Sequence, residues 1–406
     1  MKVCVVGGGA AGMMSAIELA KGGVDVVLLE KNEKLGKKIF ITGKGRCNVT
    51  NDCEIQEMFG NVVHGEKFLK SALYGFTPQD TMRFFEDAGL QLVVERGNRV
   101  FPFSQKSSDV IKTLEIEMRR CGVQVKLNTQ VLSIDKTDGE FVVKTDLKDE
   151  ICDKVIVATG GYSYQSTGST GDGYKFAKNF GLNIVEPRQA LVPIILAQNV
   201  SSLQGISLKN VTLTAYDENG KEMSSEFGEM LFTQRGVSGP IALTTSSYIN
   251  RKSKVTLSLD LKPALDIDTL DKRILRDFDE RKNQDIKNVT RALLPERLNS
   301  YVIKRAGIQE SKKVNSITKQ EREKLVYTLK NLTFDVVGLA PFTEAIVTAG
   351  GVDVKGLKPT CECKTVDGLY FVGETIDIDA LTGGFNLQLA FATGVCAARD
   401  IVKKMQ

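Results

Sequence analysis

The first 30 residues contain the feature that most constrains how this chain folds. An apolar run, Val3-Cys4-Val5-Val6, is followed by Gly7-Gly8-Gly9-Ala10-Ala11-Gly12. The apolar run predicts a buried strand of a parallel sheet. Apolar residues at helical spacing follow Gly12, and a second apolar run, Val24 to Leu29, ends at Glu30. The segment therefore predicts a complete β-α-β unit with a glycine turn between its first strand and its helix.

The glycines of this turn have the spacing G-x-G-x-x-G at Gly7, Gly9 and Gly12. In a dinucleotide-binding fold the first glycine allows a tight turn, the second lets the backbone approach a pyrophosphate, and the third lets helix and strand pack closely. The helix N-terminus offers free N–H groups and partial positive charge to the phosphates. Glu30 lies 18 residues after Gly12, close to the spacing of about 20 for the acid that binds an adenosine ribose. The unit predicts a dinucleotide site, and an acid here argues against a 2′-phosphate.

Composition limits the number of domains and the expected partners. A chain of 406 residues with 42% hydrophobic and 26% charged residues predicts a globular protein of two or three domains. Its net charge of +4 gives no support to a nucleic-acid partner. Because no uninterrupted apolar run of about 18 residues is present, no membrane partner is expected.

The cysteines and the single histidine limit the possible chemistry. The eight cysteines are scattered and form no C-x-x-C pair, and His64 is the only histidine. A metal site is therefore not expected. Reduced cysteines and the lack of an export signal predict a cytoplasmic location. A Ser-His-Asp or Cys-His mechanism would have to use His64, which we expect on a surface turn before Gly65.

The residue pattern changes along the chain and predicts four segments. Residues 1–188 continue the opening alternation of strands and helices. Short strands joined by polar turns, typical of antiparallel sheet, occupy residues 189–262, and residues 334–353 are expected to complete that unit. Helical apolar stripes and dense charge mark residues 263–333 as a small helical insert with a solvated face. Residues 354–406 return to strand, glycine turn and helix.

A basic, glycine-rich segment follows the expected ribose acid. Residues 31–46 contain six basic residues and one acid. Within them, Thr42-Gly43-Lys44-Gly45-Arg46 combines glycines, exposed N–H groups and cations, which are the parts of an anion-binding loop. A plain solvated loop is the alternative. The position directly after Glu30 favours a loop that reaches the pyrophosphate or the reactive ring of a bound dinucleotide.

Two further strands run into glycine turns, from Lys154 to Gly161 and from Leu369 to Glu374. A strand late in the chain that returns to the first nucleotide domain is typical of flavoproteins with dinucleotide folds. Relatives of glutathione reductase carry a second G-x-G-x-x-G and often a redox C-x-x-x-x-C, and this chain has neither. If the protein uses NAD(P)H, that nucleotide must bind without a Rossmann unit of its own.

Five motifs together resemble a known family. They are residues 7–12, Lys37-Lys38 with residues 42–51, Ala158-Thr159-Gly160-Gly161, Leu231-Phe232-Thr233 with residues 236–240, and Gly373-Glu374 with residues 383–388. The pattern covers nearly the whole chain. It is similar to that of the bacterial FAD-dependent flavoproteins that include aminoacetone-oxidase-like enzymes and bile-acid pathway flavoprotein reductases. The resemblance implies an α/β fold, with a Rossmann-like FAD-binding domain formed by the N- and C-terminal segments, an inserted β-barrel-like domain and a small helical cap.

The resemblance also implies where non-covalent FAD binds. The glycine turn should bind the pyrophosphate, Glu30 the adenosine ribose, and backbone groups of Gln130-Val131 the adenine. Thr42 to Asn48 should lie along the ribityl chain and the isoalloxazine ring. Gly383 to Leu387 should place a helix N-terminus near the pyrimidine ring, where its partial positive charge stabilises reduced flavin. The expected FAD-binding residues are Gly7, Gly9, Ala10, Ala11, Gly12, Glu30, Lys31, Lys37, Thr42, Gly43, Gly45, Arg46, Cys47, Asn48, Gln130, Val131, Ala158, Thr159, Gly160, Gly161, Gly373, Glu374, Gly384, Phe385, Asn386 and Leu387.

The expected activity is a two-step flavin reaction. NAD(P)H reduces FAD, and the reduced flavin passes hydride to an unsaturated or carbonyl-conjugated small molecule, such as a steroid- or bile-acid-like compound. The proton for this reduction would come from Tyr162, Tyr164, Arg46, Arg235 or bound water. Cys47 is the candidate redox thiol. A small residue packed against the flavin ring is the favoured interpretation, because no partner cysteine lies at redox spacing.

Two alternative activities remain open. The first is an FAD-dependent oxidase that takes hydride from a small amine such as aminoacetone and reduces oxygen to hydrogen peroxide. The second is a flavin-dependent nucleic-acid modification protein, which would need an extended basic surface and an affinity that falls steeply with salt. The expected partners are a small-molecule substrate and NAD(P)H, with neither nucleic acid nor membrane.

Overall fold

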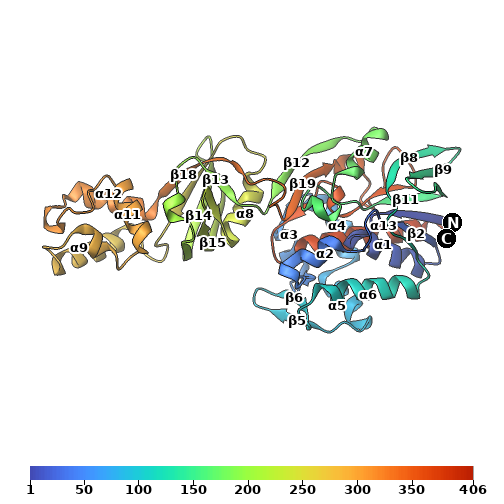
Figure 1. Ribbon diagram of the computed structural model, residues 1–406, viewed down its shortest axis with the longest axis horizontal. Helices are drawn as coiled ribbons and strands as arrows, with labels where there is room; N and C mark the ends of the chain where they lie inside the picture. Colours follow the sequence, from blue (N-terminus) through green and yellow to red (C-terminus); the bar gives the residue numbers. More distant parts are fainter. Residues whose placement is uncertain (406) are drawn as a thin grey trace. The chain divides into compact units, whose positions relative to one another are not determined.

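A five-stranded parallel sheet forms the core of the part of the protein that contains both chain ends (Figure 1). In the computed structural model, which describes residues 1–405, the strand order is β20-β11-β1-β2-β7. The strands are β1 (Lys2–Val6), β2 (Asp25–Leu29), β7 (Gln124–Lys126), β11 (Lys154–Val157) and β20 (Leu369–Phe371). The late strand β20 therefore lies beside β11, so the chain returns to its first domain as the sequence predicted.

The register of the sheet brings the glycine turns to one edge. Val6 lies opposite both Val157 and Leu29, and Val157 lies opposite Phe371. Because these strands end side by side, the turns after β1, β11 and β20 leave the sheet at its carboxyl edge, together with the acid that follows β2. Ligands of open parallel sheets bind at this edge.

Two helices far apart in the sequence pack against each other. α1 (Ala10–Lys21) and α13 (Phe385–Lys403) lie side by side (Figure 1). A Cβ atom at Gly394 would lie 2.6 Å from the Ala11 carbonyl oxygen and 2.7 Å from Ser15 Oγ. The glycine in α13 therefore permits the short distance between the two helices. Through this contact the C-terminal segment supports the helix that follows the first glycine turn.

The loop after β2 contains a helix that the sequence analysis did not predict. α2 (Lys37–Ile41) begins after Gly36, whose φ is 64°. Ile39 is its buried residue, and a segment this short carries no periodic apolar stripe. The other helices and strands of this part are β3 (Thr50–Asn51), α3 (Ile55–Gly60), β4 (Val62–His64), α4 (Glu66–Gly75), α5 (Pro78–Asp87), β5 (Leu92–Glu95), β6 (Arg99–Pro102), α6 (Ser107–Arg120), β8 (Val131–Thr137), β9 (Glu140–Thr145), β10 (Glu150–Cys152), α7 (Asp172–Asn179), β12 (Ile184–Ala190), β19 (Val347–Val352) and β21 (Asp379–Ala380).

Residues 190–341 form a second unit around a closed β-barrel. Its strands, in spatial order, are β13 (Ile194–Leu196), β16 (Gly236–Ser238), β15 (Glu222–Phe232), β14 (Ser207–Asp217), β17 (Val255–Asp260) and β18 (Leu332–Leu339). Its helices are α8 (Pro240–Ile249), α9 (Ile267–Glu280), α10 (Ile286–Thr290), α11 (Glu296–Arg305) and α12 (Lys319–Lys330). Leu213 and Leu257 of the barrel and Leu270 of α9 are at most 1% exposed and belong to one apolar core. Barrel and helices therefore share their core.

The two compact units are residues 1–189 with the chain from Phe342 onward, and residues 190–341. β18 completes the barrel, whereas β19 pairs with β12 in the first unit. Residues 342–353, which we expected in the barrel, thus lie with the first unit, because their strand finds its partner there. The predicted fold class, a Rossmann-like domain built from both ends of the chain with an inserted barrel and helices, is confirmed. Within residues 1–405, no helix is both long enough and apolar enough to cross a membrane.

We expect Gly394→Ala to lower the free energy of unfolding by about 1–3 kcal/mol, because the added methyl group would overlap the backbone of α1. Gly75→Ala is the matched control, since Gly75 also lies in a helix and a Cβ there meets no described atom within 4 Å. The control should stay within about 1 kcal/mol of the wild type. Urea unfolding followed by circular dichroism measures both variants. Equal unfolding midpoints would contradict the close helix contact.

Candidate functional site

The glycine turn after β1 forms an open cradle at the carboxyl edge of the sheet. Gly7 has a φ of 107°, and a Cβ there would lie 2.5 Å from the Ala158 carbonyl oxygen. A Cβ at Gly12 would lie 1.9 Å from the Gly7 carbonyl oxygen. Gly9, in contrast, faces open space, with no described atom within 4 Å of a Cβ position. The first and third glycines are therefore required by packing, and the second leaves room beside the N-terminus of α1.

Glu30 follows β2, and hydrogen bonds hold its carboxylate at this edge. Oε2 accepts a hydrogen bond from Gly8 N at 2.7 Å, and Oε1 accepts bonds from Asn32 N at 2.8 Å and Asn32 Nδ2 at 2.6 Å. The residue is 8% exposed. A carboxylate has about four acceptor positions, so one is left for a hydroxyl group of a ligand. The geometry fits an acid that holds a ribose next to the glycine turn.

The predicted anion-binding loop turns back sharply after α2. Gly43, Lys44, Gly45 and Cys47 have φ values from 59° to 83°. Left-handed backbone at Lys44 and Cys47 is costly unless the surrounding contacts enforce it. Cys47 N closes the loop by donating to the Thr42 carbonyl oxygen at 3.0 Å. A Cβ at Gly45 would meet no described atom within 4 Å, so the loop backbone is open to a ligand there.

Arg46 and Cys47, two expected catalytic residues, are engaged within the protein. Arg46 Nε donates to Gln105 Oε1 at 2.5 Å, its guanidinium pairs with Glu95, and it lies 4.1 Å from the ring centroid of Phe101. Cys47 is fully buried, and this burial raises the pKa of its thiol to about 12. At neutral pH Cys47 is therefore a thiol and not the thiolate that a nucleophile requires.

Glu374, in the turn after β20, binds residues of three other segments. Glu374 pairs with Lys38 and accepts hydrogen bonds from Ser163 Oγ at 2.6 Å and Thr348 N at 2.8 Å. Lys38 Nζ also donates to Ser163 Oγ at 2.6 Å. The cluster ties α2 to the turns after β11 and β20. Lys37, the neighbouring lysine that we expect to bind FAD, lies with its Nζ 3.4 Å from Asn32 Oδ1 and 3.4 Å from Glu33 Oε2.

The N-terminus of α13 packs against β3. Gly384 has a φ of 97°, and a Cβ there would lie 2.3 Å from the Thr50 carbonyl oxygen. The side chain of Asn386 accepts from Ala380 N at 2.9 Å and donates to the Ala380 carbonyl oxygen at 2.7 Å. The amide of Asn386 is thus used to hold the loop that precedes α13.

Gln388 is a structural residue whose role the sequence analysis missed. It is fully buried, and its Oε1 accepts hydrogen bonds from Thr50 Oγ1 and Thr81 Oγ1, both at 2.7 Å. Its Nε2 donates to the Phe76 carbonyl oxygen at 2.9 Å. One amide therefore joins α13 to β3, α5 and the end of α4. A polar residue within the apolar stripe of a helix is the signal that could have identified it.

Two of the expected FAD-binding residues, Lys31 and Gln130, have hydrogen-bond partners within the protein. Lys31 Nζ pairs with Asp172 Oδ2 at 2.6 Å. Gln130 N donates to Asp146 Oδ1 at 2.9 Å, and the Gln130 carbonyl oxygen accepts from Asp146 N at 3.0 Å. Both backbone groups of Gln130 are therefore occupied. Val131 is the first residue of β8, and the adenine contact expected of this pair stays a prediction.

The turn after β11, residues 158–161, is bonded to its neighbours. Thr159 Oγ1 accepts from Gly173 N at 3.0 Å, and Gly160 N donates to Thr375 Oγ1 at 3.0 Å. The second bond connects this turn directly to the turn after β20. The turns after β11 and β20 are therefore held next to each other at the carboxyl edge of the sheet.

The candidate proton donors lie in two different units. Tyr162 follows the turn after β11, and its ring centroid is 5.3 Å from that of Tyr174 and 5.6 Å from that of Phe342. Burial raises the pKa of Tyr174, and its hydroxyl has no hydrogen-bond partner within the described chain. Tyr164 has a φ of 52°. Arg235 is exposed between β15 and β16 of the second unit.

We expected His64 on a surface turn, but the structure places it in a strand. It ends β4, which pairs with β21, and its Nδ1 lies 2.6 Å from Asp379 Oδ1. Asp379 is fully buried. The strand was missed because Val62-Val63-His64 is too short to show a period.

These features fit a bound FAD molecule. The space beside Gly9 accommodates a pyrophosphate, and the acceptor left on Glu30 accommodates a ribose hydroxyl. Asn48 Oδ1 is buried without a hydrogen-bond partner in residues 1–405. Because buried polar atoms in proteins are nearly always paired, this acceptor next to the glycine loop fits a donor on a ligand. Residues 7–12, Glu30 and the loop through Asn48 would hold the group.

Comparison with known proteins gives matches over the whole chain. The family model described as HI0933-like protein Rossmann domain matches residues 1–400. A ribosomal RNA dihydrouridine synthase of Haemophilus influenzae is 31% identical over 408 residues, which cover 98% of each chain. A 3-dehydro-bile acid delta(4,6)-reductase of Clostridium scindens is 29% identical over 412 residues, 99% of each chain. The solved 3-ketosteroid delta1-dehydrogenase of Sterolibacterium denitrificans matches with a TM-score of 0.53 and 13% identity over 99% of each chain, a likeness of fold alone.

The burial of Cys47 leads to a prediction about its reactivity. Because its pKa is about 12 in place of the ordinary 9, native Cys47 should resist iodoacetamide at about pH 8 and react after unfolding. Cys121, which is only partly buried, is the internal control and should react in the native protein. Between pH 9 and about 12 the Cys47 thiol loses its proton in the unfolded chain but keeps it in the folded protein. Cys47 therefore lowers the free energy of unfolding as pH rises above about 9. Mass spectrometry of the peptides measures alkylation, and rapid modification of native Cys47 would contradict the prediction.

Proposed function

The chain belongs to the HI0933-like Rossmann-domain family and is an FAD-dependent oxidoreductase, and we propose that it reduces a carbon–carbon double bond conjugated to a carbonyl group, with NAD(P)H as the hydride donor. The observation that carries this proposal is the shared chemistry of two relatives that match nearly the full chain. The name of one describes reduction of double bonds in a 3-dehydro (3-oxo) bile acid. The name of the other is that of a dihydrouridine synthase, and dihydrouridine is uridine with the double bond next to a ring carbonyl saturated.

Reduction of such a bond requires a proton donor from the protein or water. Hydride addition at the β-carbon places negative charge on the carbonyl oxygen, and the α-carbon must then receive a proton. FAD, when bound, supplies the hydride. Tyr162 is the strongest candidate for the donor, because its hydroxyl donates to no described residue and aromatic contacts hold its ring. Its backbone N–H, bonded to Thr348 Oγ1 at 2.8 Å, keeps it beside the Glu374 cluster.

The other candidates have weaker support. The guanidinium of Arg46 is paired with Glu95, and Arg235 belongs to the second unit. Tyr164 lies in the same turn as Tyr162, and its left-handed backbone marks a position where contacts enforce an unusual conformation. We therefore keep Tyr164 as the second candidate for the proton donor.

Two substrates fit this reaction. The first is a small steroid- or bile-acid-like enone, in keeping with the bile-acid reductase. The second is the uracil ring of an RNA, which is favoured by the relative with 31% identity over 98% of the chain. This second substrate departs from the expectation, based on net charge, that no nucleic acid binds. A cytoplasmic location is part of the proposal, in keeping with eight free cysteines.

Anaerobic stopped-flow absorbance of the yellow protein tests the reaction. We expect NADH or NADPH to bleach the flavin band, and a conjugated enone or a uridine-containing RNA to restore it without oxygen. The acceptor that restores the colour faster identifies the substrate class. If aminoacetone bleaches the flavin and neither nicotinamide does, the reductase proposal is wrong and the amine oxidase alternative is correct.

Tyr162→Phe should slow the restoration of the flavin band by the acceptor about 10²–10⁴-fold, because a general acid is lost. Bleaching by NAD(P)H does not need this proton and should stay within about twofold of the wild type. Tyr164→Phe tests the neighbouring hydroxyl in the same turn, and Tyr74→Phe is the control for an exposed tyrosine elsewhere in the unit. A restoration rate that only Tyr164→Phe lowers would reassign the donor. An unchanged rate in both variants would assign the proton to water.

A further inference from the structure

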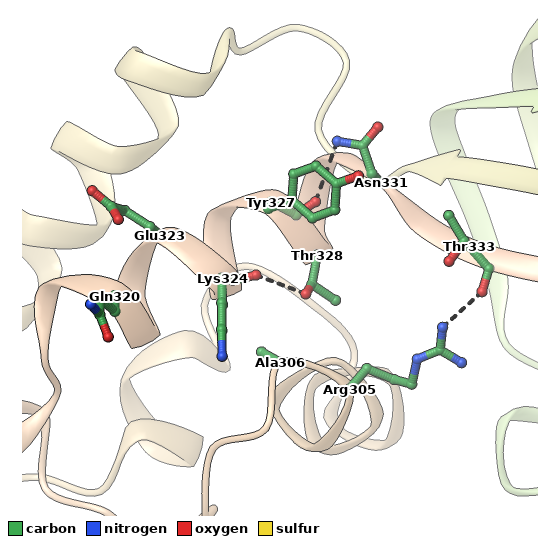
Figure 2. Close-up of a pocket in the computed structure, with 9 residues that line it drawn as sticks. All are labelled: Arg305, Ala306, Gln320, Glu323, Lys324, Tyr327, Thr328, Asn331 and Thr333. Carbon is green, nitrogen blue, oxygen red and sulfur yellow. Dashed lines mark hydrogen bonds between the residues drawn. The ribbon is translucent and has the colours of Figure 1, made fainter. Parts of the chain in front are cut away.

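The second unit contains an open groove lined by residues of α11, α12 and the start of β18 (Figure 2). Its volume is about 530 Å³. Figure 2 shows Tyr327 and Lys324 on α12 and Arg305 at the end of α11 around this space. With the exception of Ala306, the residues that line it are polar, charged or aromatic. The groove is therefore lined by an aromatic ring, cationic side chains and hydrogen-bonding groups, with no aliphatic side chain larger than that of Ala306.

The sequence of α12 explains why Tyr327 faces solvent. One face of the helix enters the apolar core through Leu325, Val326 and Leu329. Lys324, Tyr327 and Asn331 are spaced by three and four residues and share another face. Tyr327 is 61% exposed. A capping box formed by Thr318 and Glu321 fixes the start of the helix. The exposed ring thus stands on a well-anchored helix.

The two cations of the groove have no carboxylate partner within residues 1–405. Arg305 donates to the Thr333 carbonyl oxygen at 2.9 Å, and its guanidinium lies 5.9 Å from the ring centroid of Phe334. Lys324 forms no ion pair with any described side chain, and Glu323, the acid of the groove, lies 3.8 Å from Lys319. In contrast, Lys330 on the same helix is paired with Asp260 at 2.6 Å. Positive charge in the groove is therefore available to an anionic ligand.

The helical segment around the groove concentrates the positive charge of the protein. Residues 262–333 carry 17 Lys and Arg against 11 Asp and Glu, a net charge of +6, although the whole chain has only +4. The rest of the chain is therefore slightly acidic. A local excess of basic residues is the electrostatic feature that nucleic-acid binding requires, and the net charge of the whole chain conceals it.

We propose that this groove binds an unpaired nucleotide of single-stranded RNA, with its base stacked on Tyr327 and its phosphate between Lys324 and Arg305. Proteins bind single strands by combining aromatic rings, on which bases stack, with a basic groove that follows the backbone. The inference rests on the RNA substrate of the proposed function, and it adds a binding site in the second unit, separate from the residues that hold FAD. The groove anchors the strand that carries the uracil.

Fluorescence anisotropy of the FAD-loaded protein with a labelled oligouridylate of about 12 nucleotides tests this site. Tyr327→Ala should weaken binding roughly 5- to 150-fold, because one base loses its stacking partner. Tyr327→Phe keeps the ring and should bind within about twofold of the wild type. Tyr74→Ala, which removes a tyrosine of similar exposure from the first unit, should leave the affinity unchanged. Lys324→Ala and Arg305→Ala should each reduce the slope of log affinity against log salt by about 1.

Three results would overturn the proposal. The first is equal affinity of the wild type and Tyr327→Ala while the flavin spectrum shows that the variant is folded. The second is a preference for duplex RNA over the single strand. The third is a competition result in which NADPH displaces the labelled oligouridylate from the wild type and unlabelled single-stranded RNA does not. That result would assign the groove to the free nucleotide. If RNA binds through Tyr327 but does not restore the colour of reduced flavin, the groove stands and the RNA reductase function fails.

Discussion

The absence of a side chain at Gly12 is the constraint on which the nucleotide-binding edge depends. A Cβ there would lie 1.9 Å from the Gly7 carbonyl oxygen, so α1 can start directly behind the turn only if this position is glycine. The same tight turn brings Gly8 N to 2.7 Å from Glu30 Oε2. The placement of α1 is thereby coupled to the placement of the acid after β2. One steric requirement thus sets the relation between the phosphate-binding and ribose-binding parts of the site.

The charged side chains around this edge are mostly paired with each other. Lys31 binds Asp172, Lys38 binds Glu374, and Arg46 binds Glu95. The basic segment after β2 therefore does not act as a cluster of free cations. The N–H groups at the start of α1 remain to meet a bound phosphate, and such fixed dipoles need little rearrangement when a charged group binds.

The sequence was sufficient for features that depend on local pattern. The β-α-β unit, the glycine spacing and the late strand that joins the first sheet were predicted because apolar runs and glycines carry them. Features that depend on distant contacts were not predictable. α2 is too short to show an apolar period, the partners of Lys37 and Lys38 depend on where that helix lies, and Gln388 acquires its role from three segments. Net charge averages over segments of opposite sign, so it could not reveal the basic segment from residue 262 to 333.

The position of β20 and α13 late in the chain has a consequence for synthesis on the ribosome. The second unit is continuous, and its barrel can close once β18 has emerged. The first unit must wait, because β11 lacks its outer neighbour β20 and α1 lacks its contact with α13 until these late segments appear. During that interval the nascent chain exposes an open strand edge, which is a template for pairing with other chains.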